Sequence, residues 1–529
     1  MSHHPVARGH RGWIPITILI LGGIGIAVVR LQPELERNLK NWATLAASLL
    51  TLALLVLWFL LLSRVAWRRR LVTAAALGLV AFGVKSMLRV DGTLDGTGLP
   101  KLTWRWTPER QLLRFDTKPA AESGKESSAV AAPERAADVP QFFGPNRTGV
   151  VQGAKLARDW NATPPRQLWR QPIGAGWSAF AVVGGRAYTQ EQRGEEEAVT
   201  CYELMTGRLL WSHSNAAHFF QWQSGHGPRA TPTVLGDRVF AFGATGILVC
   251  LDATTGKLLW SHEVLKEHKL DNLEWGASAS PLVFDETVIV TGGQSTGPTL
   301  IAYRRSDGEA LWRSGSGKAS YSSPILATLA GKRMVLCVTA AALTGTDPAT
   351  GDILLSFPWT EERIPKASQP VVLEGDKVFI SAGYGVGCAL VQVQAGADGK
   401  LAATQIWKSL RMKTQFNSVA EREGYLYGLD DGLLACVEAT TGERKWKGGR
   451  YGSGQSLLVD DLVIVQTEPG AVALAEAKPD GFTELGRMPA LSAKTWNHPT
   501  LAGRYLLVRN SEEVVCYELA TEEKKTANR

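Results

Sequence analysis

One short phrase recurs through most of the chain, and this repeat constrains the fold more than any other feature. Its clearest copies are VTCYELMTGRLLW (199–211), ILVCLDATTGKLLW (247–260) and LIAYRRSDGEALW (300–312). Weaker copies occupy 343–357, 390–407, 434–446 and 472–486, and a truncated copy occupies 514–525. The turn glycines of the full copies are 39 to 52 residues apart, which is typical of a repeat architecture.

Each copy has the same internal pattern. An alternating strand leads to a polar residue, a Thr-Gly or Asp-Gly turn, and a second strand that ends in tryptophan. The glycine allows the positive φ of a tight turn, and the tryptophan offers a large apolar plate for packing one sheet on the next. We therefore expect roles in docking neighbouring sheets for Gly207, Trp211, Gly256, Trp260, Gly308, Trp312, Gly442 and Trp446.

Two more short strands precede each phrase, as in TPTVLGDRVFAFG (231–243). Four strands in about 45 residues is the size of a β-propeller blade. The copies predict an all-β domain at 141–520, an eight-bladed β-propeller with four-stranded antiparallel blades, followed by a polar tail at 521–529. The eighth blade lacks its last strand, and RQLWRQPIG (166–174) is placed to supply it and close the ring. An open solenoid is the alternative.

Residues 1–90 have a different character. Three apolar runs predict transmembrane α-helices at about 13–31, 42–63 and 71–88, each close to the ~20 residues that span a bilayer core. The third run is the weakest because Lys85 lies near its end. A cleaved signal peptide is the alternative for the first run, but a second apolar run follows at once. Residues 91–140 are expected to connect this anchor to the propeller, with a flexible second half.

The net charge of +7 belongs to the anchor. Residues 1–100 hold eleven Lys or Arg and four Asp or Glu, and the rest of the chain holds 46 of each. We therefore expect no nucleic-acid partner for the propeller. Four arginines lie between the second and third helices, and Arg8 and Arg11 precede the first. The positive-inside rule then places the propeller on the periplasmic side of a bacterial cytoplasmic membrane, provided that the third helix is real.

The repeat resembles the pyrroloquinoline-quinone-like (PQQ-like) propeller family, whose pattern is Ala/Cys-x-Asp-x-x-Thr-Gly-x-x-x-Trp. The best match is CLDATTGKLLW (250–260), the resemblance covers about 141–520, and QFFGPNRTGV (141–150) is similar to membrane-tethered members. The family includes quinone-dependent dehydrogenases and cofactor-free scaffolds, among them the lipoprotein propeller that assists outer-membrane protein assembly. The resemblance therefore implies the fold and leaves the function open.

Cofactor chemistry is the first functional question that the resemblance raises. The alcohol-oxidising relatives stack PQQ on a disulfide between adjacent cysteines, whereas the six cysteines here are dispersed. Three of them, Cys201, Cys250 and Cys436, lie six residues before a turn glycine, and this shared position predicts buried core residues. Oxygen ligands for calcium could be sought in LDNLEWG (270–276). We expect neither a cofactor nor a metal, and a PQQ- and calcium-dependent alcohol or sugar dehydrogenase that donates electrons to membrane quinone is the alternative.

Aromatic and polar residues precede the first strand of several blades and predict a recognition surface around the propeller axis. The loop HFFQWQSGHGPR (218–229) is expected to overhang this surface. Packing within the ring is the alternative role for these residues. We hypothesise a non-enzymatic binding or scaffolding module for an envelope protein, a peptide or a glycan, anchored to the lipid bilayer by its three helices. The candidate contacts are Trp177, His226, Arg229, Trp275, Tyr321, Phe416, Trp496 and His498.

Overall fold

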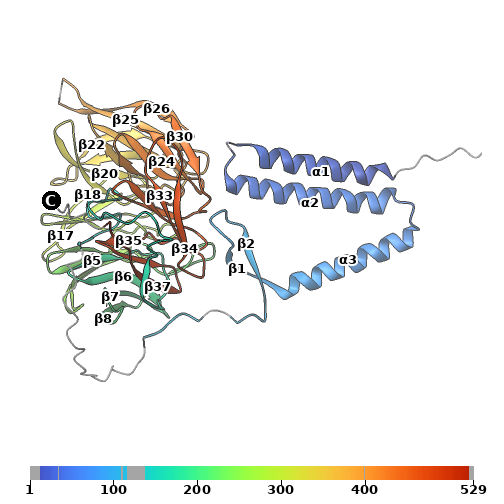
Figure 1. Ribbon diagram of the computed structural model, residues 1–529, viewed down its shortest axis with the longest axis horizontal. Coiled ribbons are helices and arrows are strands. Elements are labelled where there is room, and N and C mark those ends of the chain that lie inside the picture. Colours follow the sequence, from blue (N-terminus) through green and yellow to red (C-terminus); the bar gives the residue numbers. More distant parts are fainter. Residues whose placement is uncertain (1–11, 34, 109–110, 116–136, 398, 523–529) are drawn as a thin grey trace, which may run out of the picture. The chain divides into compact units, whose positions relative to one another are not determined.

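The computed structural model describes residues 12–33, 35–108, 111–115, 137–397 and 399–522 (Figure 1). The expected flexible part of the connector and the polar tail lie largely outside these ranges. The described chain divides into two compact units, one up to residue 110 and one from residue 111 onwards, and each is described by itself.

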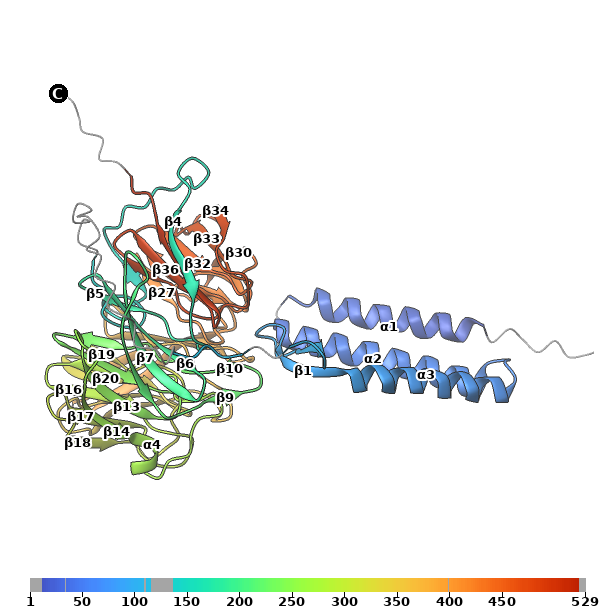
Figure 2. The same cartoon turned by 90° about the horizontal axis from the view of Figure 1, so that it is seen from below.

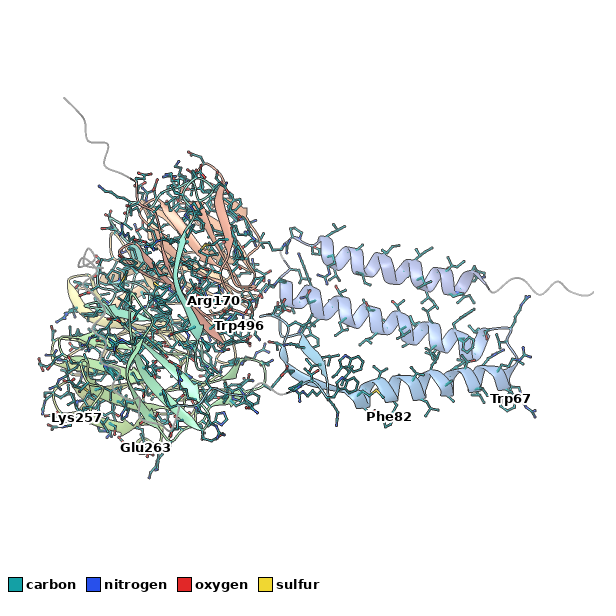
Figure 3. The ribbon with its side chains drawn as sticks, turned by 60° about the horizontal axis from the view of Figure 1, so that its bottom comes forward. Trp67, Phe82, Arg170, Lys257, Glu263 and Trp496 are labelled. Atoms are coloured by element: carbon teal, nitrogen blue, oxygen red, sulfur yellow. The ribbon has the colours of Figure 1, made fainter. Side chains whose placement is uncertain are left out.

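The N-terminal unit contains three helices, α1 (Trp13–Leu31), α2 (Arg37–Leu62) and α3 (Trp67–Met87), all long and apolar enough to cross a membrane. α2 and α3 begin four or five residues before the predicted positions, because arginine and lysine propagate a helix well beyond the apolar run. α1 packs on α2 at Gly22, where an added Cβ would lie 2.3 Å from the Thr51 hydroxyl. Other side chains, such as Trp67 and Phe82 of α3, project away from the helices (Figure 3).

A hairpin follows α3 directly. Its strands are β1 (Leu88–Thr93) and β2 (Pro100–Trp104), which pair antiparallel. The turn-rich start of the expected connector is therefore an ordered part of the helical unit (Figure 2).

The second unit is an eight-bladed β-propeller, as the repeat predicts. The first strands of several neighbouring blades contact each other around the axis, so each blade runs outwards in chain order. Blade 1 consists of β5 (Ala181–Val183), β6 (Arg186–Arg193), β7 (Glu196–Glu203) and β8 (Leu209–Asn215), and blade 2 consists of β11 (Thr233–Leu235), β12 (Arg238–Phe242), β13 (Ile247–Asp252) and β14 (Leu258–Glu263). Blade 3 consists of β15 (Leu282–Phe284), β16 (Thr287–Thr291), β17 (Leu300–Arg304) and β18 (Ala310–Ser314), and blade 4 consists of β19 (Ile325–Leu329), β20 (Lys332–Val338), β21 (Ala342–Thr346) and β22 (Ile353–Pro358).

The remaining blades include both departures from the regular pattern. Blade 8 takes its outer strand from β4, which pairs antiparallel with β37 and closes the ring as predicted. Blade 7 gains a fifth strand, β3, parallel to its inner strand. Blade 5 consists of β23 (Val371–Leu373), β24 (Lys377–Ala382), β25 (Gly387–Ala395) and β26 (Leu401–Ser409), and blade 6 consists of β27 (Ala420–Arg422), β28 (Tyr425–Asp430), β29 (Leu433–Glu438) and β30 (Arg444–Gly448). Blade 7 consists of β31 (Gln455–Val459), β32 (Leu462–Gln466), β33 (Ala471–Glu476), β34 (Glu484–Pro489) and β3 (Val150–Val151). Blade 8 consists of β35 (Thr500–Ala502), β36 (Tyr505–Arg509), β37 (Glu513–Glu518) and β4 (Arg166–Pro172).

Tryptophans link neighbouring blades. The Trp211 ring lies over Gly256 of the next blade, where an added Cβ would be 2.4 Å from the ring, and its Nε1 donates to the Ala253 carbonyl at 3.1 Å. Trp446 differs, because it packs against the Phe482 ring at 5.7 Å. The other stacked pairs are Trp169 on Gly207, Trp260 on Gly308, Trp312 on Gly351 and Trp407 on Gly442.

All six cysteines are buried and free. Cys201, Cys250 and Cys436 lie directly opposite the docking tryptophan of their own blade, and Cys516 lies opposite Trp169. Burial raises the pKa of Cys201 to about 12 and that of Cys436 to about 11. The repeated cysteines are core residues of the blades.

The segment that contains QFFGPNRTGV lies across the inner strands of several blades. Val139 bridges to Val182 of blade 1, the Pro140 carbonyl accepts from the Val234 amide of blade 2 at 2.7 Å, and β3 joins blade 7. Arg147 is buried and donates to the carbonyls of Ser280 and Pro281 at 2.9 and 2.8 Å. We call residues 137–151 the crossing segment.

Candidate functional site

Two sets of loops lie at one end of the propeller axis: the connections from each outer strand to the next inner strand, and the turns between second and third strands. We call this end the 4–1 face. All the predicted contact residues belong to its connections, at 173–180, 216–232, 268–281, 315–324, 359–370, 410–419, 449–454 and 490–499.

Three of the predicted residues meet in one aromatic cluster. The Trp496 ring centroid lies 4.9 Å from that of Trp177 and 5.1 Å from that of Phe416, and all three side chains are half-buried. They come from blades 8, 1 and 6, and the equivalent position of blade 7 is Ser453, whose side chain is small. We call these three residues the axial cluster (Trp496 is labelled in Figure 3).

The axial cluster is held in place by hydrogen bonds of its indoles. The Trp177 Nε1 donates to the Ser224 carbonyl at 2.6 Å, and the Trp496 Nε1 donates to Glu468 Oε1 at 2.8 Å. With the N–H groups satisfied inside the protein, the rings contribute apolar faces and edges, and the Lys494 amine lies 4.2 Å from the Trp496 ring centroid. The cluster therefore offers a pre-ordered apolar contact surface.

Trp275 and Tyr321 form a second aromatic pair on the 4–1 face. Their ring centroids are 5.6 Å apart in an edge-on arrangement, and the Trp275 Nε1 lies 3.3 Å from Gln223 Oε1. Burial raises the pKa of Tyr321. Both side chains are half-buried, so this pair adds apolar surface of the same kind.

The loop 218–229 folds into a small hairpin of β9 (Phe220–Gln221) and β10 (Gly225–His226). His226 Nδ1 lies 2.9 Å from the Nε2 of His218. The other ring nitrogen of His218, Nδ1, lies 3.0 Å from Glu195 Oε2. The Phe220 and Trp222 side chains are 57% and 46% exposed. The loop thus presents aromatic side chains to solvent, while His226 is engaged by His218.

Arg229 holds this hairpin in place through hydrogen bonds to its residues. Its guanidinium donates to the Gly227 carbonyl, to Ser224 Oγ at 2.8 Å and to the Gly225 carbonyl at 3.2 Å, and it lies 4.4 Å from the Phe219 ring centroid. Burial lowers the pKa of Arg229 to about 9, against the opposing effect of the Glu197 charge. The donors of Arg229 are used within the loop that carries it.

His498 lies two residues after Trp496 and is buried beside the start of the inner strand of blade 8. Its Nδ1 lies 2.8 Å from the Pro499 carbonyl and its Nε2 lies 3.0 Å from the Ser456 carbonyl, and Phe142 and Phe143 of the crossing segment pack on its ring. Burial lowers the pKa of His498 to about 4. We correct the expectation for this residue: the crossing segment covers it, so it lies outside the exposed surface of the 4–1 face.

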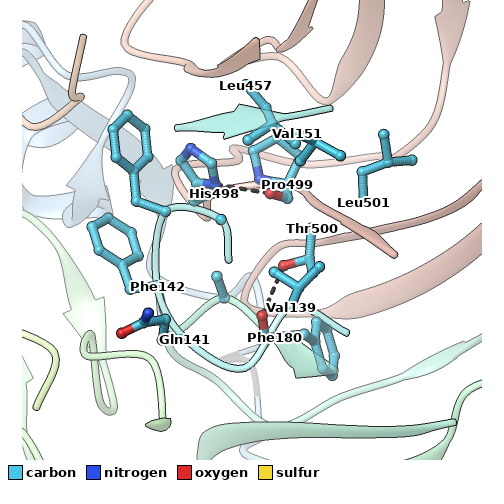
Figure 4. A pocket seen from close by; sticks show the side chains of 13 residues that line it. Val139, Gln141, Phe142, Val151, Phe180, Leu457, His498, Pro499, Thr500 and Leu501 are labelled. Carbon is cyan, nitrogen blue, oxygen red and sulfur yellow. Dashed lines mark hydrogen bonds between the residues drawn. The ribbon is translucent and has the colours of Figure 1, made fainter. Parts of the chain in front are cut away.

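His498 lines a small pocket of about 10 Å³ between the crossing segment and blades 1, 7 and 8 (Figure 4). Its polar groups are engaged within the fold, since Thr500 Oγ1 donates to the Phe180 carbonyl at 2.9 Å. Valine, leucine and phenylalanine side chains form most of the rest. The pocket is a packing junction without a reactive group at hand.

Hydroxyls near the axis serve the ring itself. The Ala179 amide donates to Thr231 Oγ1 of the next blade at 3.1 Å, and the Thr231 amide donates to Ser280 Oγ at 2.9 Å. The Ser280 amide repeats the contact to Ser323 Oγ at 2.9 Å. The hydroxyls of Thr231, Ser280 and Ser323 therefore link neighbouring blades.

The calcium ligands sought in 270–276 have separate neighbours. Asp271 accepts from Ser295 Oγ at 2.6 Å, and the Asn272 side chain donates to the Ala244 carbonyl at 2.8 Å. Within the described residues, no group of three or more His, Cys, Asp or Glu side chains could hold a metal ion. The six cysteines lie in different blades, so no two of them are adjacent in the fold.

These features define the class of the protein: an eight-bladed β-propeller preceded by three long apolar helices. The model of the family described as outer membrane protein assembly factor BamB matches residues 117–274 and 195–448. The matches cover more than half of the chain, so the protein belongs to this family of PQQ-like propellers. A search of curated protein sequences finds no match.

Solved structures of low sequence identity share the fold. Quinohemoprotein alcohol dehydrogenase from Comamonas testosteroni is 12% identical, with a TM-score of 0.54 over 73% of this chain and 81% of that chain. Quinohemoprotein alcohol dehydrogenase ADHIIG from Pseudomonas putida HK5 is 13% identical, with a TM-score of 0.52 over the same shares. BamB from Moraxella catarrhalis is 15% identical, with a TM-score of 0.49 over 67% of this chain and all of that chain.

Proposed function

We propose that the protein is a membrane-anchored binding or scaffolding module that holds a protein segment on its 4–1 face. The observation that carries this proposal is the axial cluster, where Trp177, Phe416 and Trp496 from three blades form one apolar surface. Tryptophan and other aromatic residues dominate the energy of protein interfaces when they are packed and pre-ordered.

The surroundings of the cluster favour a peptide or protein over a glycan. Phe220 and Trp222 extend the apolar surface outwards, while Arg229 and the indole N–H groups make their hydrogen bonds inside the loops. A glycan site needs several free donors and acceptors beside its aromatic platform. The family description, an assembly factor of outer membrane proteins, supports an envelope protein as the partner.

Photo-crosslinking in cells tests this proposal. A photoreactive amino acid at position 416 should give a discrete adduct with an envelope protein, and Trp177→Ala in the same chain should lower the adduct yield at least about tenfold. The control position is Lys257, exposed in the turn before β14 (labelled in Figure 3), which should give no such adduct. Equal labelling from positions 416 and 257 would contradict the proposal, and a glycosidase-sensitive adduct would indicate a glycan partner.

The quinone-dependent dehydrogenase is the alternative function, favoured by the likeness to the two alcohol dehydrogenases. It is separated from the binding proposal by adding PQQ and calcium to the purified protein and measuring dye reduction with alcohols and sugars. Saturable cofactor binding with turnover would replace our proposal by this alternative.

We further propose that the propeller lies on the extracytoplasmic side of the membrane. Four arginines lie at the junction of α2 and α3: Arg64 in the short loop, and Arg68, Arg69 and Arg70 in the first turn of α3. The Arg70 guanidinium donates to the carbonyls of Leu60 and Val65 at 2.8 and 2.6 Å. Positively charged loops remain in the cytoplasm.

Reporter fusions check this orientation. Alkaline phosphatase fused after residue 66 should be inactive, because that loop stays in the cytoplasm, and the same enzyme fused after residue 529 should be active. A green fluorescent protein fusion at each site is the matched control and should give the opposite pattern. A reversed pattern would place the propeller in the cytoplasm.

A further inference from the structure

The β1–β2 hairpin has two chemically different faces. Leu88 pairs with Trp104 and Val90 pairs with Leu102, and directly paired side chains share a face of an antiparallel ladder. The opposite face carries Arg89 with Thr103, and Asp91, whose carboxylate lies 3.7 Å from the Lys101 amine. The hairpin is therefore amphipathic.

The apolar face is open to its surroundings within the helical unit. Trp106 continues it, stacking on Trp104 with ring centroids 4.9 Å apart and planes within 9°. The exposed fractions of these side chains run from 44 to 65% for Val90, Leu102, Trp104 and Trp106. An isolated two-stranded hairpin is marginally stable in water, so a face of this kind needs an apolar environment.

Contacts with the helices fix where the hairpin lies. β1 starts at the residue after α3 ends, and the Arg105 amide donates to the Met87 carbonyl at 2.8 Å. At the start of α2, the Trp42 Nε1 donates to the Thr97 carbonyl at 3.2 Å. The hairpin is thus held at the end of the bundle where α2 begins and α3 ends, and Figure 2 shows β1 there.

α3 is long enough to cross a membrane, but its uncharged run is shorter than the hydrocarbon core. Its uncharged run between Arg70 and Lys85 has 14 residues, 71–84. At 1.5 Å per residue this run is about 21 Å long, against about 30 Å for a hydrocarbon core. The hairpin, with its apolar face, directly follows the end of α3 that carries Lys85.

We propose that the β1–β2 hairpin is a membrane-interface element. It lies in the boundary between headgroups and acyl chains, with Val90, Leu102 and Trp104 towards the lipid and Asp91 and Lys101 towards water. Tryptophan is enriched at this depth, and the unpaired strand edges require a hydrated layer rather than the hydrocarbon core. The inference rests on the membrane anchoring and is independent of what the 4–1 face binds.

Spin labelling of the full-length protein in phosphatidylethanolamine–phosphatidylglycerol liposomes tests the inference. The variants Val90→Cys and Asp91→Cys place one label on each face of β1, and Leu77→Cys places one in the middle of α3. The native thiols are buried with raised pKa values, so they should not compete for the label. The readout is the collision rate of each label with oxygen, which concentrates in lipid, and with a nickel chelate, which stays in water.

At Val90 we expect several-fold higher accessibility to oxygen than to nickel, and at Asp91 the reverse. Equal nickel accessibility at Val90 and Asp91 would overturn the inference, because the apolar face would then lie in water. A Val90 label shielded from both reagents would also overturn it, since protein would cover the face. A water-like label at Leu77 would overturn the membrane anchor itself, which separates the two failures.

Discussion

Replacing Arg509 with methionine is expected to lower the free energy of unfolding by about 3–5 kcal/mol, because it removes one partner of a buried ionic network. Arg509 is fully buried at the end of β36, and its guanidinium donates from blade 8 to blade 1, the first blade of the ring. The acceptors are Thr189 Oγ1 at 2.8 Å, the Gln190 carbonyl at 3.1 Å and the Gly174 carbonyl at 2.8 Å. Methionine fills the volume and supplies none of these donors.

Glu191 is the buried anion of the same network. It accepts from Arg193 at 2.9 Å, Thr200 at 2.6 Å and Tyr202 at 2.5 Å. Burial alone would raise the pKa of Glu191, but the Arg193 and Arg509 charges and the hydroxyl hydrogen bonds outweigh it, and the pKa is lowered. Its contribution to stability is therefore complete above the unfolded pKa of about 4.3 and is lost as the pH falls through the lower folded pKa.

Urea unfolding of the full-length protein in detergent, followed by tryptophan fluorescence at pH 7, measures the effect. The matched control is Arg363→Met, since Arg363 pairs with Glu361 on the exposed surface and should leave the unfolding midpoint unchanged. The Arg509 variant should also lose stability at a higher pH than the natural protein, because Glu191 then has one cation fewer. A midpoint shift no larger than that of the control would contradict the role of the network.

Gly256→Ala is expected to cost about 2–5 kcal/mol. Gly256 has φ +72°, which strains any residue with a Cβ by about 1–2 kcal/mol. In addition, the new Cβ would lie 2.4 Å from the Trp211 ring, and overpacking of a core contact costs a further ~1–3 kcal/mol. The ring cannot move away freely because its Nε1 is bonded to the Ala253 carbonyl.

Gly236→Ala is the matched control for Gly256→Ala. Gly236 lies in the β11–β12 turn of the same blade with φ +63°, and no atom lies within 4 Å of an added Cβ. The same urea titration should give the conformational part of the cost, about 1–2 kcal/mol. If the two variants lose equal stability, the tryptophan–glycine contact does not dock the blades.

The repeat made the propeller predictable, because each blade carries its own strand pattern, turn glycine and docking tryptophan. Ring closure by 166–174 was also predictable, since a missing strand and an unassigned strand were both visible in the sequence. The crossing segment was not, because its contacts to blades 1, 2, 3 and 7 follow no period. Arg509 and Glu191 likewise belong to different blades, and nothing in either neighbourhood signals the other.

The candidate site was predictable in part. Aligning the blades placed Trp177, Phe416 and Trp496 at equivalent positions, and the structure brings these three together. The alignment could not show that Arg229 uses its donors within its own loop, nor that Phe142 and Phe143 cover His498. Both facts depend on loop conformation and on a segment outside the repeat.

The closing strand also sets a schedule for folding. β4 and β37 are joined by contacts such as that between Arg166 and Glu518, which are 352 residues apart in the chain. At 5–20 residues per second, the ribosome needs about 20–70 s to make the partner of β4. During that interval β4 has no sheet to join, because the other three strands of blade 8 have not yet been synthesised. The ring therefore cannot be completed one blade at a time as the chain is synthesised. Blade 8 is completed, and the ring closed, only after β37 has been made and can pair with β4.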